Sequence, residues 1–289
     1  MKSQSSKSLQ KQTTIIKSDT ICYRLKIKFK HMKKIALLLL LFVFTNSFVQ
    51  RENAYTTGEW FKLRIHYGMV NAGYATLEIK DAVKNNKKVH HVVGKGWTVG
   101  MTKFFFKVDD NYESYFDKET GKPFQFVRKI NEGGYTKNQE GFFNQTKNTV
   151  LVKDYKHKTE KTFSVPEEIQ DILSSFYYLR NHPKIDKLKV GESIAIDMFF
   201  DDETTKFKLK FLGREDISTK FGKVSCMMFR PYVQAGRVFK EEESLTVWIS
   251  DDDNKIPIRL KASLAVGSLK ADLEAFKGLK HSFKIKVEK

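Results

Sequence analysis

The chain has 289 residues, of which 40% are hydrophobic, so it is long enough to bury a sizeable core. Its formal net charge is +18, but residues 1–47 carry half of it, which leaves about +9 on the rest. That remaining excess follows alternating patterns such as Lys206–Phe211, which are typical of solvated strand faces. The charge therefore does not indicate a nucleic-acid-binding protein.

A secretory leader is predicted near the start of the chain. Lys33 and Lys34 precede the apolar run Ile35–Phe44, and small polar residues up to Ser47 follow it. This pattern predicts a signal peptide over residues 32–47, cleaved near Ser47, and a periplasmic or secreted mature protein. Ten apolar residues reach only about half of a roughly 30 Å hydrocarbon core, so we expect no transmembrane anchor in the mature form.

The residues before the leader have no pattern of their own. Residues 1–31 are polar and basic, whereas signal peptides carry their positive residues next to the apolar run. We therefore interpret Met32 as the start of translation and residues 1–31 as a non-native upstream extension. A long basic leader is the alternative.

Cysteine usage adds no covalent scaffold to the mature chain. Cys22 lies in the leader region, which leaves Cys226 alone, so no intramolecular disulfide is expected. No cysteine follows the apolar run, so acylation of the first mature residue is not expected either. Cys226 lies in an apolar strand pattern between Val224 and Met228, which predicts a buried, unreactive thiol.

The first half of the mature chain is a succession of strand-like segments. They are rich in Phe, Tyr, Val and Thr and are separated by Asn-Asn, Gly-Lys-Pro, Glu-Gly-Gly and Lys-Asp turn signals, which predicts an antiparallel meander. The predicted strands are Trp60–Tyr67, Gly73–Lys80, Lys88–Lys95, Asn111–Asp117, Pro123–Ile130, Tyr135–Asn144, Thr149–Asp154 and Lys158–Ser164.

One helix interrupts the strands, over about residues 167–181. It follows Pro166, begins with acidic residues and ends at Asn181-His182-Pro183, and its apolar positions recur at helical spacing, so it is expected to plug or cap a sheet. Strands are then predicted at Ser193–Phe200, Thr205–Leu212, Lys223–Arg230, Ser244–Ser250, Ile256–Leu264, Leu269–Phe276 and His281–Val287. The fold class is thus mainly β: antiparallel, curved or open barrel-like sheets with one inserted helix. Residues 48–289 are predicted to form one domain, with two β halves meeting near residue 185 as a variant.

Several motifs resemble one bacterial family. They are Gly58–Leu63 with Tyr67-Gly68 and Ala72–Ala75, Asp109–Tyr112 with Ser114-Tyr115, Asp171–Arg180, and Val247–Asp252 with Ile256-Pro257 and Val266–Ser268. This chain resembles the exported family known as domain of unknown function 3108, over nearly all of its mature length. The resemblance implies an exported, β-rich cell-envelope protein, as found in Bacteroidota, without an established activity.

No catalytic motif is found, so an enzyme is not expected and no cofactor is called for. His90 and His91 are adjacent on a predicted strand and so point to opposite faces, which disfavours metal binding even with His66 nearby. Asp251 and Asp253 are weak candidates for a calcium site, although a tight turn explains them better. The acids Asp201–Glu203 and Glu241–Glu243 are explained in the same way, by a turn and by a solvated strand entry.

Aromatic residues carry the remaining functional signal. The run from Gly96 to Phe106 does not alternate cleanly, so some of its rings lack a single core face to occupy. The predicted lining of a cavity or patch is Trp97, Phe104, Phe105, Phe106, Phe176 and Tyr177. Ordinary core packing is the alternative for these rings.

Three functional hypotheses follow from these patterns. The first is a noncatalytic binding or carrier module for a lipid or amphiphilic envelope component, with outward lysines that meet anionic head groups. The second is an accessory protein of envelope assembly that binds a protein or glycan partner. The third is a glycan hydrolase, which requires two carboxylates about 5 to 9.5 Å apart in a groove.

Overall fold

The computed structural model describes residues 53–233 and 245–286 and arranges their strands in one antiparallel sheet. The strand order is β8-β7-β6-β5-β4-β3-β2-β1-β14-β13-β12-β11-β10-β9, so neighbours in the sheet are neighbours in sequence except where β1 meets β14. The predicted signal peptide lies outside the described residues. In the part of the chain that is described, no helix has the length and apolarity needed to span a membrane.

The strands match the predicted meander closely. Their bounds are β1 Trp60–Tyr67, β2 Val70–Lys84, β3 Lys87–Thr98, β4 Asp109–Asp117, β5 Pro123–Glu132, β6 Tyr135–Asn144, β7 Thr149–Asp154, β8 Thr159–Ser164, β9 Ser193–Phe200, β10 Glu203–Thr219, β11 Gly222–Val233, β12 Leu245–Ser250, β13 Pro257–Ser263 and β14 Ser268–Lys277. The helices are α2 Thr102–Phe105, α3 Ile172–Arg180 and the 3-10 turn η1 Ile185–Lys187.

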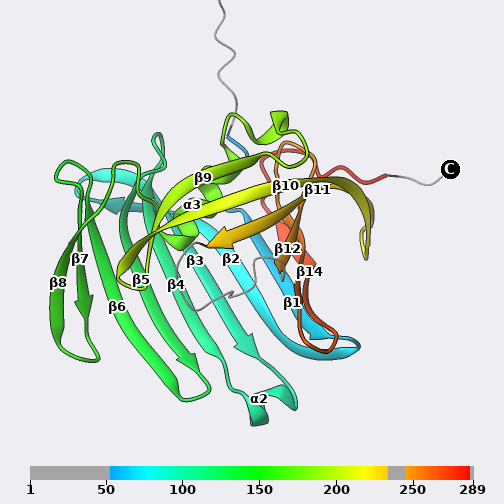
Figure 1. The fold of residues 1–289 in the computed structure, drawn as a ribbon, viewed down its shortest axis with the longest axis horizontal. Coiled ribbons are helices and arrows are strands. Elements are labelled where there is room, and N and C mark those ends of the chain that lie inside the picture. The colour runs from blue at the N-terminus through cyan, green and yellow to red at the C-terminus, as the bar shows by residue number, and fades with distance from the viewer. Residues whose placement is uncertain (1–52, 234–244, 287–289) are drawn as a thin grey trace, which may run out of the picture. The chain divides into compact units, whose positions relative to one another are not determined.

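The sheet curls so far that β9, the strand at one edge of the sheet, crosses the sheet's inner face (Figure 1). Phe199 of β9 packs against Phe126 of β5 and Phe143 of β6, with ring centroids 6.2 and 6.4 Å apart. The segment before α3 joins this edge, because the Gln170 N–H donates to the Asp197 carbonyl at 3.0 Å and the Phe199 N–H donates to the Gln170 carbonyl at 2.8 Å. Strands from both predicted halves therefore belong to one curled sheet.

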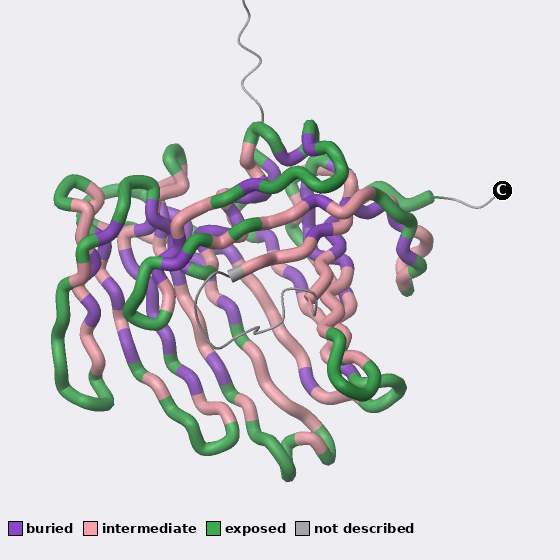
Figure 2. The backbone as a smooth tube through the Cα atoms, viewed as in Figure 1, coloured by how far each residue is buried: buried purple, intermediate pink, exposed green. Residues whose placement is uncertain are grey.

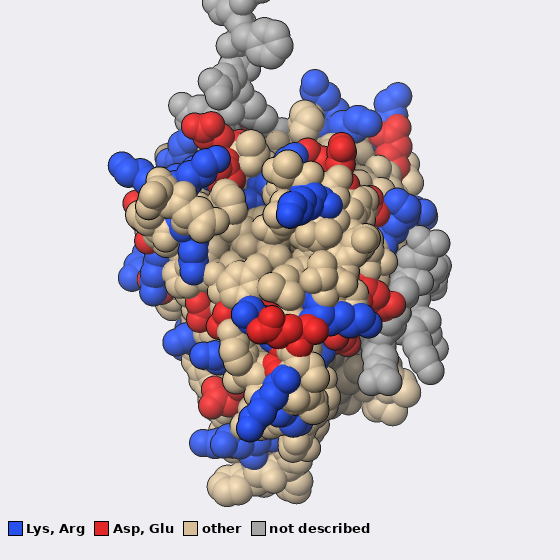
Figure 3. All heavy atoms as spheres, turned by 90° about the vertical axis from the view of Figure 1, so that its left-hand side faces the viewer, with Lys and Arg blue, Asp and Glu red and all other residues tan. Residues whose placement is uncertain are grey.

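Helix α3 lies against the inner face and fills one end of the curl. Tyr177 is fully buried among Tyr55 and Phe116, and Phe176 packs edge-on against Phe61 of β1. Figure 2 shows buried positions concentrated around this helix, whereas the turns at the other end of the strands are exposed. Charged side chains of both signs are interspersed over the surface drawn in Figure 3.

Three local predictions differ from the structure. The helix starts at Ile172 rather than near residue 167, because Gln170 is extended against β9 and Asp171 caps the helix with Ser174. Residues 281–286 form no strand; only an isolated bridge joins Lys286 to Lys223. The short helix α2 in the turn between β3 and β4 was not predicted.

Candidate functional site

The inner face of the sheet divides into a filled half and an open half, and two glycines of β3 mark the boundary. A Cβ at Gly94 would lie 3.2 Å from Leu77 and 3.5 Å from Leu173 of α3. Gly96 faces the same side two residues further along, yet a Cβ there would meet nothing within 4 Å. Helix α3 thus covers the sheet up to Gly94, and no described residue covers the inner face at Gly96.

A buried ion pair holds α3 in the filled half. Arg180 donates to both carboxylate oxygens of Glu59, at 2.6 and 2.7 Å, and neither side chain is exposed. Its remaining donors bind the Asn254 and Ala54 carbonyls. Burial alone lowers the pKa of Arg180, but the Glu59 carboxylate outweighs it and raises that pKa above its ordinary value. This charge is therefore fully compensated inside the protein.

Aliphatic side chains line the inner face of the open half on its β1 side. They lie on the same face as Phe61, which contacts α3, and each is only half-buried. The register of β1 with β2 and β14, and of β14 with β13, sets them side by side. These residues are Leu63, Ile65, Ala75, Leu260, Ala262 and Ala271.

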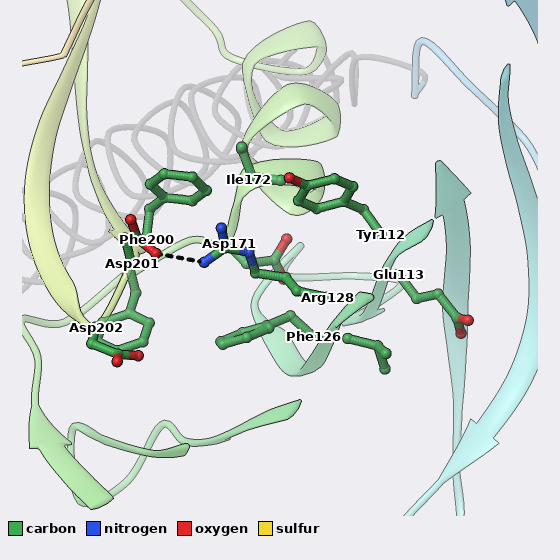
Figure 4. Close-up of a pocket in the computed structure, with 11 residues that line it drawn as sticks. Tyr112, Glu113, Phe126, Arg128, Asp171, Ile172, Phe200, Asp201 and Asp202 are labelled. Atoms are coloured by element: carbon green, nitrogen blue, oxygen red, sulfur yellow. Dashed lines mark hydrogen bonds and ion pairs between the residues drawn. The ribbon is translucent and has the colours of Figure 1, made fainter. Parts of the chain in front are cut away.

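A polar group lies on the β4–β6 side of the same face (Figure 4). The Arg128 guanidinium lies over the Phe200 ring at 4.3 Å and donates to Asp201 at 3.2 Å, and Lys137 also pairs with Asp201. Arg128 is nearly buried, and its Nε has no hydrogen-bond partner among the described residues. The hollow beside it has about 10 Å³ of free space, which is room for about one water molecule.

Two carboxyl groups on this side have raised pKa values. Burial raises the pKa of Asp171, the helix cap, to about 6, although the Ser114 hydroxyl donates to it at 2.6 Å. Burial and the adjacent Asp110 carboxyl raise the pKa of Glu132 to about 7.

A second, larger pocket lies on the outer face, beside the β10–β11 turn. Its volume is about 480 Å³, within the range of small-ligand sites. Arg64, Tyr74 and Asn71 line it together with charged residues of β13 and β14. Asp272 is engaged by His66 and Arg259, whereas Arg64 has no hydrogen-bond or ion-pair partner in the described part of the chain. The pocket thus has an unpaired guanidinium.

The six aromatic residues predicted from the sequence do not share one site. Trp97 lies on the outer face, where its ring is 6.0 Å from that of Tyr74. Phe104, Phe105 and Phe106 are exposed in and after α2, whereas Phe176 and Tyr177 belong to the packed interior. A common cavity lined by all six is excluded by this placement; any ligand-binding role of the individual rings stays a prediction.

The acidic cluster after β12 is organised as a turn. Asp252, rather than Asp251 or Asp253, accepts hydrogen bonds from Ser250 and from the backbone of Asn254. Asp251 pairs with Arg214 at 2.8 Å and Asp253 is exposed. Across residues 53–233 and 245–286, no group of three or more His, Cys, Asp or Glu side chains could hold a metal ion.

The remaining reactive side chains are engaged or buried. His91 stacks on Tyr115 and binds Glu113 at 2.8 Å on the outer face, whereas His90 points into the core. Cys226 is fully buried, as predicted, and burial raises the pKa of its thiol to about 12.

Sequence reasoning missed the residues that define the inner face. Arg128 was one of many basic residues in a strand pattern, and nothing in the sequence distinguishes it. Gly94 and Gly96 carry a usable signal, because glycines two apart in a strand interior face the same side and mark a close approach or an open surface. Glu59 and Arg180 belong to motifs quoted for the family resemblance, but their pairing across 121 positions was not predicted.

The fold defines a class of protein: a β-barrel-like, curled antiparallel sheet with a short helix inside. Comparison with known families identifies one family. Residues 62–274 match the model of the family described as protein of unknown function DUF3108, and the chain belongs to this family. The resemblance found in the sequence is thereby confirmed. A search of curated proteins found no match.

One solved structure supports the fold, and two others align more weakly. A β-barrel-like protein of domain of unknown function DUF1849 from Brucella abortus aligns with a TM-score of 0.54 at 10% identity, covering 78% of this chain and 99% of that one. A candidate lipoprotein from Parabacteroides distasonis gives 0.33 at 12% identity over 78% and 100%. A candidate exported protein with a YmcC-like fold from Bacteroides fragilis gives 0.29 at 9% identity over 77% and 97%.

Proposed function

We propose that this protein is an exported, noncatalytic cell-envelope protein that binds a lipid or other amphiphile on the open half of its inner face. One observation carries the proposal: half-exposed aliphatic side chains line the β1 side of the inner face, and a polar group centred on Arg128 lies on the β4–β6 side of the same face. Leu63 and Ile65 lie on one side and Arg128 with Lys137 on the other. Export is supported by the leader pattern of the sequence.

The surface suits an amphiphile for a simple physical reason. An acyl chain against the half-exposed aliphatic side chains removes apolar area from water at about 25 cal/mol per Å². The buried Nε of Arg128 has no partner among the described residues, so a head group would contact it through the one water that the hollow beside it can hold. The ligand lies on an open face rather than in an enclosed cavity, because the hollow beside Arg128 holds only about one water.

Titration with a fluorescent fatty acid, such as cis-parinaric acid, tests the proposal. Gly96→Leu places a side chain on the open inner face and should weaken binding by about tenfold or more, while the fold is retained because a Cβ there meets no atom within 4 Å. Lys95→Leu is the matched control, since its side chain is exposed on the outer face of the same strand. Equal binding by all three proteins, or none by the wild type, would contradict the proposal.

The outer pocket favours a second candidate function, recognition of an acidic saccharide. Arg64 and the buried Oδ1 of Asn71 have no partner within residues 53–233 and 245–286. In a pocket of about 480 Å³ they suit a ligand with a carboxylate or phosphate beside hydroxyl groups. Arg64→Ala should then abolish binding to an array of acidic saccharides. The fatty-acid affinity should not change in this variant.

A further inference from the structure

Exposed hydrophobic side chains are concentrated at one end of the sheet. In the described residues, twelve of the sixteen large hydrophobic side chains that are exposed lie in or beside the turns β1–β2, β3–β4, β5–β6, β7–β8 and β13–β14. In an antiparallel meander these five turns fall on the same side, opposite the end filled by α3. We call this end the rim.

Hydrogen bonds show that the turns of the rim are neighbours. The Tyr67 hydroxyl at the end of β1 donates to the Val266 carbonyl in the β13–β14 turn at 2.9 Å. The Gly133 N–H in the β5–β6 turn donates to the Lys107 carbonyl after α2 at 2.8 Å. The hydrophobic tips are therefore parts of one edge of the molecule.

Three tips of the rim are almost purely apolar. Met69 is 97% exposed in the β1–β2 turn, and Phe104 and Phe105 are 89% and 82% exposed in α2, none of whose residues is buried. Leu264 and Val266 are exposed in the β13–β14 turn. Exposed apolar surfaces of this kind mark interaction sites, because their contact with water is unfavourable and binding removes it. Packing against the described residues does not explain why these rings of α2 are apolar.

The charges beside these tips identify the kind of partner. The tip segments 68–71, 99–107 and 264–268 contain Lys103 and Lys107 and no acidic residue. Neither ammonium group has an ion-pair partner among the described residues. In Figure 3 the lowest protrusion of the molecule is free of charge and Lys and Arg lie directly above it. Apolar tips followed by lysines match the order of acyl chains and anionic head groups in a bilayer.

We propose that the rim docks on the surface of an anionic lipid bilayer, with the three apolar tips inserted to interfacial depth. A bilayer fits better than a protein partner because the tips are separate protrusions on different hairpins, which insert individually, whereas a protein interface needs one continuous complementary surface. The inference goes beyond ligand binding and does not depend on it. Docking at the rim would also place Ile65 and Leu269, at the rim end of β1 and β14, next to the lipid.

Flotation with phosphatidylcholine vesicles that contain phosphatidylglycerol tests this inference on the exported protein. The wild type should float with the vesicles, and Phe104→Ser combined with Phe105→Ser should lower the vesicle-bound fraction by about tenfold or more. Lys103→Gln combined with Lys107→Gln should weaken binding a few-fold and reduce its salt dependence. Val83→Ser is the matched control. Val83 is also an exposed hydrophobic residue, 66% exposed, but it lies at the end of β2 away from the rim.

A second measurement keeps the test valid if the serine variant aggregates. Phe105→Trp should show strong fluorescence quenching by lipids brominated on the acyl chains, whereas Val83→Trp should show no quenching beyond that of the wild type. Gly96→Leu should float like the wild type, which separates docking from ligand binding.

Three results would overturn the inference. They are a wild type that does not float, a serine variant that floats as well as the wild type, and self-association lost in the serine variant without any vesicle binding. The last result would identify a second copy of the chain as the partner.

Discussion

The filled and open halves of the inner face are built by the same strands, yet their side chains differ. Around α3, large rings such as Tyr177 and Phe116 are buried against one another. Beyond Gly94, the inward-facing residues on the β1 side, such as Leu63, Ala75 and Ala271, are small or aliphatic and only half-buried. The difference shows that the elements lying across this face, α3 and β9, decide which part of it is core.

Charged groups follow the same division. In the filled half, Arg180 and Glu59 satisfy each other and have no exposure. In the open half, the Nε of Arg128 has no partner in the part of the chain that the structure describes, and Asp201, which pairs with this guanidinium, is partly exposed. A buried ion pair whose donors and acceptors are all satisfied is typical of a structural role. A charged group with an unsatisfied donor beside a hydrophobic surface is typical of a binding site.

The largest expected effect is loss of the ion pair in the filled half. Arg180→Met leaves the Glu59 carboxylate buried without its partner, which should lower the free energy of unfolding by about 3 to 5 kcal/mol. Urea denaturation measures it. Lys206→Met is the control, because its pair with Asp197 is exposed and should contribute at most about 1 kcal/mol. Equal effects in the two variants would show that α3 is not held by this pair.

The next largest effect is expected at two glycines, Gly141 in a covered part of the inner face and Gly96 in the open half. A Cβ at Gly141 would lie 2.0 Å from the Phe126 ring, where β9 covers the sheet, so Gly141→Ala should destabilise the protein by about 1 to 3 kcal/mol. Gly96→Ala should be neutral or stabilising by about 0.5 to 1 kcal/mol, because alanine restricts the unfolded chain and meets no atom. Thermal unfolding compares them. A destabilising Gly96→Ala would mean that the open half is covered.

The smallest expected effect is a pH dependence in the open half. The pKa of Glu132 is raised from 4.5 to about 7, so between these values the folded protein keeps a proton that the unfolded chain has released. Its contribution to stability therefore falls as the pH rises through this window. The Glu132→Gln variant has no proton to lose at this position. The stability of this variant relative to the wild type should therefore increase as the pH rises from below 4.5 to above 7. A stability difference between the two proteins that does not change with pH would contradict the raised pKa of Glu132.

The meander was predictable because its signals are local. β1, β6, β7 and β9 begin and end at the residues that alternation and turn signals indicated. The start of α3 was not predictable from local signals. Gln170 is held extended by a bridge to Met198, a contact that no local pattern encodes. The proline and acidic residues before it favour a helix that tertiary pairing overrides.

The candidate surfaces were predictable only in part. The irregular run of aromatics before Phe106 indicated rings without a core position, and Phe104 and Phe105 are indeed exposed. That they share an edge with Met69 and Val266 depends on the closure of β1 on β14, which joins the two ends of the chain. The open half depends on how far α3 reaches, which no sequence pattern gives.

The most direct test of the open half as a ligand surface is photo-crosslinking with a diazirine-bearing fatty acid, followed by peptide mapping of the adducts. The account predicts adducts on inner-facing residues of β1, β13 and β14, such as Leu63, Leu260 and Ala271, and their loss in Gly96→Leu. Adducts confined to the outer face around Tyr74 and Trp97, or adducts unchanged in Gly96→Leu, would contradict it.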